Sequence, residues 1–278
     1  MFKCMSPDTI RIELEWDQCL PLAKAHGFEG IDARIDLKRS PSSYRDRLAE
    51  HGLKAGGVPL PFPLRSDSRT FEEGIASFPD VVRCAAEAGY RRFRTWVPPF
   101  SDELPYREHF KLQADRCRRL AKIMADHGCV FALEFVAPRK SRMGHKYSFI
   151  HTSQQLLDLC EAAGPNTGLL LDSWHWHTSL GIVEDILCLQ NSQVVYVHVN
   201  DAPAGIPIEN QNDKVRALPG ATGVIDIAAF MEALRKIGYD GPVAPEPMMK
   251  ELASLPPEET ARRAGAAMEK IWNLTSPA

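Results

Sequence analysis

The sequence predicts an α/β fold, a closed (β/α)₈ barrel, and three observations support this. Short apolar segments alternate eight times with longer amphipathic segments, so the hydrophobic period changes repeatedly from that of a strand to that of a helix. The chain has 278 residues, a usual length for one such barrel. No G-x-G-x-x-G motif follows an early strand, which disfavours a dinucleotide-binding open sheet. We therefore expect residues 1–278 to form a single barrel domain.

Each expected strand is a short apolar run bounded by turn-forming residues. In chain order these runs are 2–5, Gly30–Ile35, Leu53–Leu60, Arg92–Val97, Cys129–Val136, Thr167–Asp172, Val194–Val199 and Pro242–Glu246. The amphipathic segments between and after them are Asp17–His26, Ser42–His51, Thr70–Ala88, Tyr106–His127, Ser153–Ala163, Val183–Gln190, Ile227–Ile237 and Pro257–Trp272. Glycine, the usual C-terminal cap, follows expected helices at Gly27, Gly52, Gly89, Gly128 and Gly238.

The composition limits the classes of partner. Hydrophobic residues make up 44% and charged residues 25% of the chain, the balance of an ordinary globular protein. The net charge is −3, so we expect no nucleic-acid partner. No run approaches 18 apolar residues, so no membrane span is expected. The seven cysteines are scattered and never spaced C-x-x-C, which favours reduced thiols in a cytoplasmic protein over disulfides or a thiolate zinc site.

Four polar residues stand at the carboxyl ends of the last four expected strands. Glu134, Asp172, His198 and Glu246 each end an apolar run. Neighbouring strands lie about 4.8 Å apart, so four adjacent strand ends can converge on one point. Three carboxylates that meet without a cation would repel one another. We therefore expect these residues to bind one divalent metal ion.

The ligand types indicate which ion this is. Carboxylates with one imidazole suit Mn²⁺, which we expect, and they also accept Mg²⁺, Co²⁺ or Zn²⁺. The chemistry that follows is proton transfer next to a carbonyl group. The metal stabilises the charge of an enediolate as a Lewis acid, and carboxylates on opposite sides of the ring of ligands supply the bases.

Several segments carry a family resemblance, which is strongest over residues 129–246. They are Phe131–Glu134, Leu171–His175, Val197–Asp201, Arg216–Gly220 and Gly238–Gly241. Together they resemble the xylose-isomerase-like TIM-barrel superfamily, which includes ketose 3-epimerases and inosose (2-keto-myo-inositol) isomerases. The likeness to inosose isomerases is the greatest, in length and around residues 171–177.

The resemblance implies roles for individual residues. It implies the same four metal ligands, with both glutamates as acid and base, and a small keto-sugar or inosose as substrate. It also implies that His175 contacts a substrate oxygen and that Arg216 binds a substrate hydroxyl or carbonyl oxygen. Barrels of this family often pair, so a homo-oligomer is expected. The sequence departs from the family at Val215, where an aspartate usually precedes the arginine, and at the prolines that flank Glu246.

Two further residues are candidates for substrate contact. His145 lies in a basic loop, residues 138–147, that could cover the site and supply a general acid; a solvated loop is the alternative. Trp96 ends the fourth expected strand, where it could pack against a sugar ring or against the rim of the barrel.

The same sequence features also permit other functions. The same metal site could serve a dehydratase or a lyase of a 3-keto glycoside, because an enediolate can expel a leaving group. A non-catalytic sugar-binding barrel is a third alternative, but all four ligands are present. A multinuclear zinc phosphoesterase is disfavoured because it needs more strand-end histidines than the sequence has.

Overall fold

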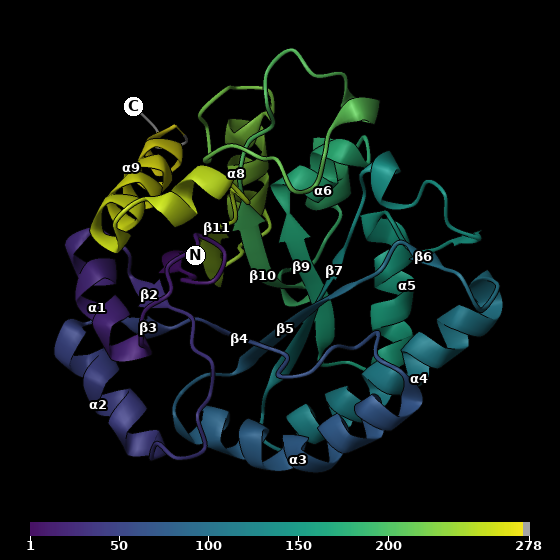
Figure 1. Ribbon diagram of the computed structural model, residues 1–278, viewed down its shortest axis with the longest axis horizontal. Coiled ribbons are helices and arrows are strands. Elements are labelled where there is room, and N and C mark those ends of the chain that lie inside the picture. Colours follow the sequence, from purple (N-terminus) through teal and green to yellow (C-terminus); the bar gives the residue numbers. More distant parts are fainter. Residues whose placement is uncertain (275–278) are drawn as a thin grey trace.

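The computed structural model describes residues 1–274 and forms a parallel barrel surrounded by helices (Figure 1). The strands of the main sheet are β1 Phe2–Met5, β2 Gly30–Ile31, β3 Lys54–Ala55, β4 Gly57–Pro59, β5 Arg92–Val97, β7 Val130–Phe135, β9 Thr167–Asp172, β10 Val194–Val199 and β11 Pro242–Pro245. They pair in the order β3-β2-β1-β11-β10-β9-β7-β5-β4, and the pairs are parallel.

The barrel closes at the third strand position, where β3 and β4 are two parts of one strand. β3 pairs with β2 and β4 pairs with β5, and Gly56 alone separates them. A Cβ atom at Gly56 would lie 2.5 Å from both Asp32 Oδ1 and Cys4 Sγ, so only glycine fits here. The eight strand positions confirm the predicted (β/α)₈ barrel.

Helices lie outside the strands at the predicted places. They are α1 Trp16–Ala25, α2 Pro41–His51, α3 Ser68–Glu87, α4 Tyr106–Ala125, α5 Ser153–Ala163, α7 Val183–Leu187, α8 Ile227–Lys236 and α9 Pro257–Asn273. Side chains of Ser40, Asp67, Thr152 and Asp226 accept a backbone N–H at the start of α2, α3, α5 and α8. The five glycines expected as helix stops all have φ between 60° and 95°.

Three features differ from the sequence prediction. Strand β2 ends at Ile31 rather than at Ile35. A short helix, α6 Ser173–Thr178, begins directly after β9. A two-stranded antiparallel sheet joins β6 Phe100–Ser101 to β8 Tyr147–Ser148. The short 3₁₀ helices are η1 Arg139–Ser141, η2 Asn191–Gln193, η3 Ile208–Asn210 and η4 Lys250–Ser254.

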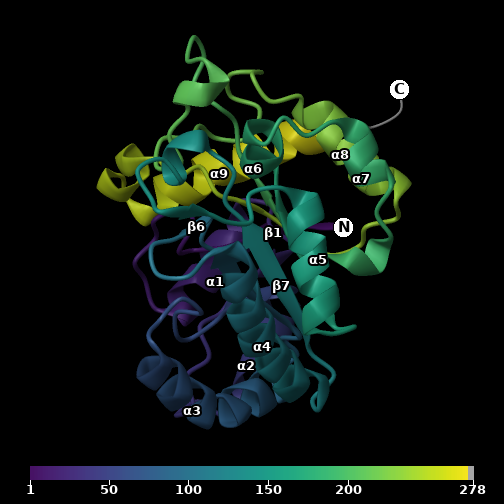
Figure 2. The same cartoon turned by 90° about the vertical axis from the view of Figure 1, so that its right-hand side faces the viewer.

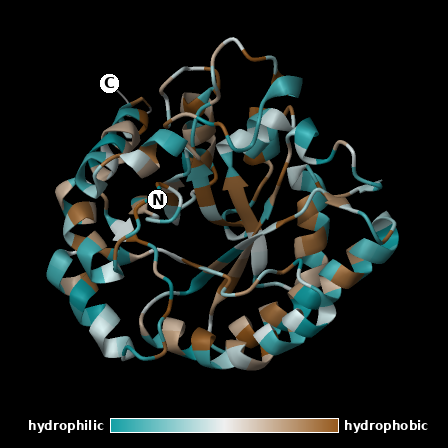
Figure 3. Cartoon of the chain, in the orientation of Figure 1, coloured by the Kyte–Doolittle hydropathy of each residue, from teal (hydrophilic) through white to brown (hydrophobic). Residues whose placement is uncertain are grey.

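Apolar side chains fill both the barrel and the space between barrel and helices. A small interior group consists of Phe2, Cys4, Ala132, Leu170, Val195, Tyr196 and Ala244. A larger core lies between the strands and the amphipathic helices. In Figure 3 the central strand β9 is brown, while teal segments lie on the outer helices. Over residues 1–274, no helix combines the length and the apolar character needed to cross a bilayer.

The carboxyl ends of the parallel strands all face one end of the barrel. Figure 2 shows α6 and the loop that follows β10 at this end, above the barrel. The residues predicted as metal ligands therefore lie beneath the long loops.

Candidate active site

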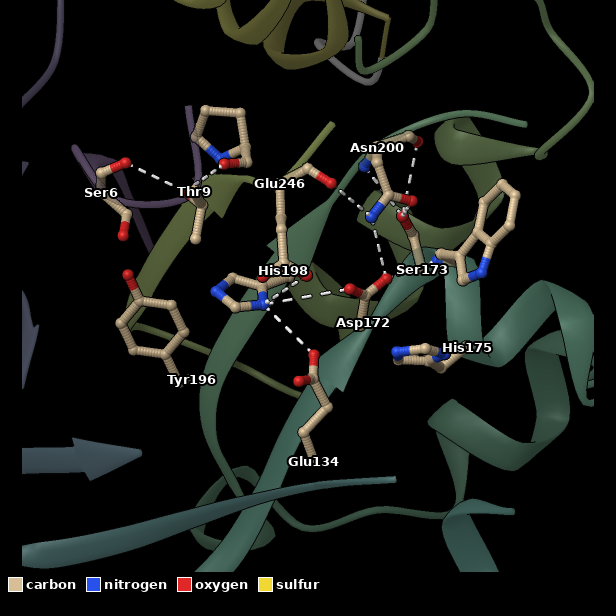
Figure 4. A network of polar contacts seen from close by, with 12 residues as sticks. Ser6, Thr9, Glu134, Asp172, Ser173, His175, Tyr196, His198, Asn200 and Glu246 are labelled. Atoms are coloured by element: carbon tan, nitrogen blue, oxygen red, sulfur yellow. Dashed lines mark hydrogen bonds and ion pairs between the residues drawn. The ribbon is translucent and has the colours of Figure 1, made fainter. Parts of the chain in front are cut away.

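Four side chains meet at the carboxyl ends of β7, β9, β10 and β11. They are Glu134, Asp172, His198 and Glu246, and one ligand atom of each lies within 4.8 Å of the others. The Nδ1 atom of His198 lies 3.2 Å from Glu134 Oε1, 3.3 Å from Glu246 Oε2 and 3.9 Å from Asp172 Oδ2. Figure 4 shows the three carboxylates directed toward this nitrogen. We call these residues the four-residue cluster.

The prolines beside Glu246 do not disturb its position. Backbone N–H groups alternate between the two sides of a strand. The N–H of Glu246 donates to Val199 O on β10 (2.9 Å), so the nitrogen of Pro245 faces β1 instead. The pairing between β1 and β11 ends at Lys3 and Val243, and no ladder hydrogen bond is lost at Pro245.

Burial and repulsion shift the proton affinities in the cluster. The pKa of Glu134 rises to about 8, first because the side chain is buried and next because the Glu246 carboxylate is near. Burial alone would lower the pKa of His198, but the Glu246 charge and contacts with both glutamates raise it to about 10. Although burial opposes it, the positive charges of His198 and Arg216 hold the pKa of Glu246 well below its usual range. The carboxylates thus require a positive charge between them.

The four-residue cluster fits one divalent cation. Ligand atoms bound at about 2.0–2.2 Å lie at most about 4.4 Å apart across an ion, close to the observed spread. Oxygen ligands with one imidazole suit Mn²⁺, Mg²⁺, Co²⁺ and Zn²⁺. The ion would replace the proton on His198 Nδ1, which already faces the carboxylates.

Neighbouring groups hold the Asp172 carboxylate in place. Its Oδ1 atom accepts from the backbone N–H of Trp174 at 2.6 Å and from Asn200 Nδ2 at 3.0 Å. Ser173 Oγ in turn donates to Asn200 Oδ1 at 3.0 Å. No sequence motif singles out Asn200, although it lies two residues after His198 and so projects from the same face of the chain.

Arg216 connects the cluster to the candidate substrate-binding residues. Its Nη1 atom lies 2.8 Å from both Asp172 Oδ2 and Glu246 Oε2. Its Nη2 atom lies 2.8 Å from Asp213 Oδ1 and 3.2 Å from His175 Nε2. Burial lowers the pKa of His175, and both of its nitrogens face donors, since the backbone N–H of Ala137 lies 3.3 Å from Nδ1 and Arg216 Nη2 lies 3.2 Å from Nε2.

A cavity of about 450 Å³ lies over the cluster. Glu134 and Glu246 line this cavity, whereas Asp172 and His198 are 0–1% exposed and are not among its lining residues. The two glutamates are therefore the members of the cluster that can reach a bound molecule. We call this space the active-site cavity.

The other predicted contact residues divide into two groups. His175, Arg216 and Trp96 line the active-site cavity. His145 instead lies 2.9 Å from Asp102 Oδ2 and stacks on Phe100 with ring centroids 3.2 Å apart, and it is not among the cavity's lining residues. The basic loop is thus held against β6, with Ser141 as its contribution to the cavity wall.

Comparisons with known proteins agree with the fold. A family model described as the xylose isomerase-like TIM barrel matches residues 20–271. The inosose isomerase of Bacillus velezensis is 27% identical over 96% of each chain. The structure of a xylose isomerase domain protein from Alicyclobacillus acidocaldarius has 28% identity and a TM-score of 0.87 over 99% of both chains. The IolI protein, solved with a bound zinc atom, superimposes with a TM-score of 0.82 over the whole of both chains at 23% identity.

A further relative matches only in part. The 3-dehydroshikimate dehydratase of Pseudomonas aeruginosa is 30% identical over 49% of this chain and 20% of its own length.

Proposed function

Because the chain belongs to the xylose isomerase-like TIM barrel family, we propose that it is a divalent-metal-dependent isomerase or epimerase. Its substrate is a keto-sugar or a keto-inositol. One observation carries the proposal: of the four residues that fit a metal ion, the two glutamates also line the active-site cavity. The inosose isomerase relatives, similar along most of their length, support the same class of substrate.

The glutamates lie on opposite sides of the cluster. Glu134 comes from β7 and Glu246 follows β11, with β9 and β10 between these strands. One carboxylate removes a proton from the carbon next to the carbonyl group, and the other returns a proton to the resulting enediolate. Because the two bases lie on different sides, return of the proton by the second base inverts that carbon. Return of the proton by the first base gives isomerisation.

The remaining wall residues bind and orient the substrate. The buried His175 contacts a substrate oxygen, and Arg216 donates to a hydroxyl or carbonyl oxygen. Trp96, which is 40% exposed, packs against the ring. A bound divalent ion, for which we propose Mn²⁺, supplies Lewis-acid stabilisation of the developing negative charge.

A second candidate is a metal-dependent dehydratase or lyase of a keto-sugar. The partial similarity to a 3-dehydroshikimate dehydratase favours it. Both candidates begin with removal of a proton next to a carbonyl group. They differ because the dehydratase or lyase releases a leaving group from the neighbouring carbon.

Turnover in heavy water tests the proposal. Protein loaded with Mn²⁺ is incubated with 2-keto-myo-inositol, with free ketoses and with 3-keto glycosides. The molecular masses of the products are measured by mass spectrometry. We expect an isomer that differs in mass only by incorporated deuterium. A product lighter by water or by an aglycone would support the second candidate, and no exchange on any of these ketones would contradict both.

A further inference from the structure

A second cavity of about 710 Å³ lies beside the active-site cavity. It lies between the loop after β4, the loop after β5 and the first half of α4. Arg65, Trp96 and Phe100 line both cavities. The Arg65 guanidinium lies 4.3 Å from the centroid of the Trp96 ring, so this stacked pair forms the shared wall.

Two buried polar atoms of the second cavity's walls have no hydrogen-bond partner within residues 1–274. They are Gln113 Oε1 and Ser66 Oγ. Gln113 is 1% exposed, and its amide nitrogen lies 3.4 Å from His109 Nε2. An unsatisfied buried polar group costs about 1–3 kcal/mol, so a ligand that hydrogen-bonds to these atoms would remove a penalty.

Contacts within the protein already hold the wall that carries these atoms in place before a ligand binds. Arg116 is 5% exposed and donates through Nη1 to Leu64 O at 2.8 Å and to Ser66 O at 2.7 Å. Its guanidinium also lies 4.7 Å from the centroid of the Phe71 ring. The loop after β4 is therefore tied to α4, and a ligand would not have to order it.

The lining of the second cavity selects an uncharged ring with hydroxyl groups. Trp96, Phe100 and two leucines offer apolar surface for a ring face. Three carboxylates, Asp67, Asp102 and Glu103, lie along the same cavity and disfavour an anionic ligand. The guanidinium groups of Arg65 and Arg116 line the same cavity and nearly balance these carboxylates, and burial lowers the pKa of His109.

We propose that the second cavity is a subsite for a second ring of the substrate. The substrate is then a glycoside or a disaccharide, with its keto ring over the four-residue cluster and its second ring beyond Arg65 and Trp96. This inference rests on the proposed function, because it places the keto ring in the active-site cavity.

Calorimetric titration measures the subsite without turnover. The one-ring probe is 3-keto-glucose, and the two-ring probe is 3-keto-cellobiose, which carries the same keto ring joined to a glucose. We expect the two-ring probe to have a dissociation constant at least about tenfold lower. The Gln113→Met substitution, which keeps the side-chain length but removes the acceptor, should reduce this advantage to about threefold and leave the one-ring probe unaffected. Gln154→Met, on the exposed face of α5, is the matched control.

The outcomes separate the subsite from the reaction. Equal affinity for the two probes, or an advantage that Gln113→Met leaves unchanged, would overturn the subsite even if 2-keto-myo-inositol is isomerised. A two-ring advantage that depends on Gln113, with no isomer formed from any ketone, would uphold the subsite and count against the proposed function. Thermal unfolding of Gln113→Met checks its fold, and Ser66→Ala tests the second unpaired atom independently.

Discussion

Two groups of buried charged residues lie inside the barrel, and they differ in how fully their charges are matched. The four-residue cluster contains three carboxylates around one imidazole nitrogen. One strand layer away, toward the amino ends, Asp32 accepts from Tyr196 Oη and Arg94 Nη2 at 2.9 Å and from the backbone N–H of Gly57 at 2.6 Å. The Asp32 group is balanced by its own neighbours. The three carboxylates of the four-residue cluster face two cationic groups, His198 and Arg216, so one negative charge is left unmatched.

This difference separates a structural role from a chemical one. A buried carboxylate that an arginine and several donors satisfy has little need of a ligand. Three carboxylates that share only His198 and Arg216 as cations can accept a further positive charge, and they sit beneath a cavity that can admit a substrate. We therefore expect substitutions in the four-residue cluster to affect activity and metal binding, and substitutions in the Asp32 group to affect stability.

The largest effect is expected at the glutamates of the cluster. Glu134→Gln and Glu246→Gln remove the groups that exchange protons with the substrate, so kcat should fall by about 10³-fold or more. The amide retains an oxygen ligand, so the protein should still bind metal at high concentration. Steady-state kinetics at saturating Mn²⁺ measures this, with Glu232→Gln as control, since the Glu232 side chain is 46% exposed on α8. Normal turnover by either variant would show that its glutamate is not an obligatory base.

A large effect of another kind is expected at Asp32. Asp32→Ala leaves Arg94, whose side chain is 11% exposed, without its carboxylate, which should cost about 3–5 kcal/mol of unfolding free energy. Urea denaturation measures the loss. Metal stoichiometry in the folded variant should remain that of the wild type. Loss of metal from folded Asp32→Ala would mean that the two groups of charges act as one.

A smaller effect is expected at Asn200, which supports the cluster from outside. Asn200→Ala removes a hydrogen bond to Asp172 Oδ1, so metal affinity should fall about 10–100-fold with little change in kcat at saturating metal. Titration with Mn²⁺ measures the affinity. Unchanged affinity would show that the backbone N–H of Trp174 and the Arg216 guanidinium orient Asp172 without Asn200.

The sequence predicts the strand ends of the second half of the barrel well. An apolar run that stops at a charged residue identifies Glu134, Asp172 and His198, because β7, β9 and β10 are buried parallel strands that carry charge only near their carboxyl ends. It predicts β2 less well. The backbone there still bonds to its neighbours, since Asp32 N donates to Met5 O, but the side chain of Asp32 turns into the barrel toward Gly57.

Features that depend on contacts between distant segments could not be predicted. Helix α6 has six residues, too few to show a period, and it begins because Asp172 accepts the N–H of Trp174 as its cap. Within its own loop, Arg216 is bound by Asp213, three positions earlier. Val215, which directly precedes Arg216, is 51% exposed. The contact of His145 with Asp102 joins residues 43 positions apart, and no local pattern in the sequence signals it.

Metal content tests the central claim most directly. Elemental analysis of the purified protein should find about one divalent ion per chain, and it should find far less in His198→Ala and Asp172→Asn. Chelation should abolish activity and lower the thermal midpoint, because an ion present at 100 times its dissociation constant stabilises the native state by about 2.7 kcal/mol. A protein with no stoichiometric metal and full activity in chelator would contradict the account, and three ions per chain would instead indicate a multinuclear phosphoesterase.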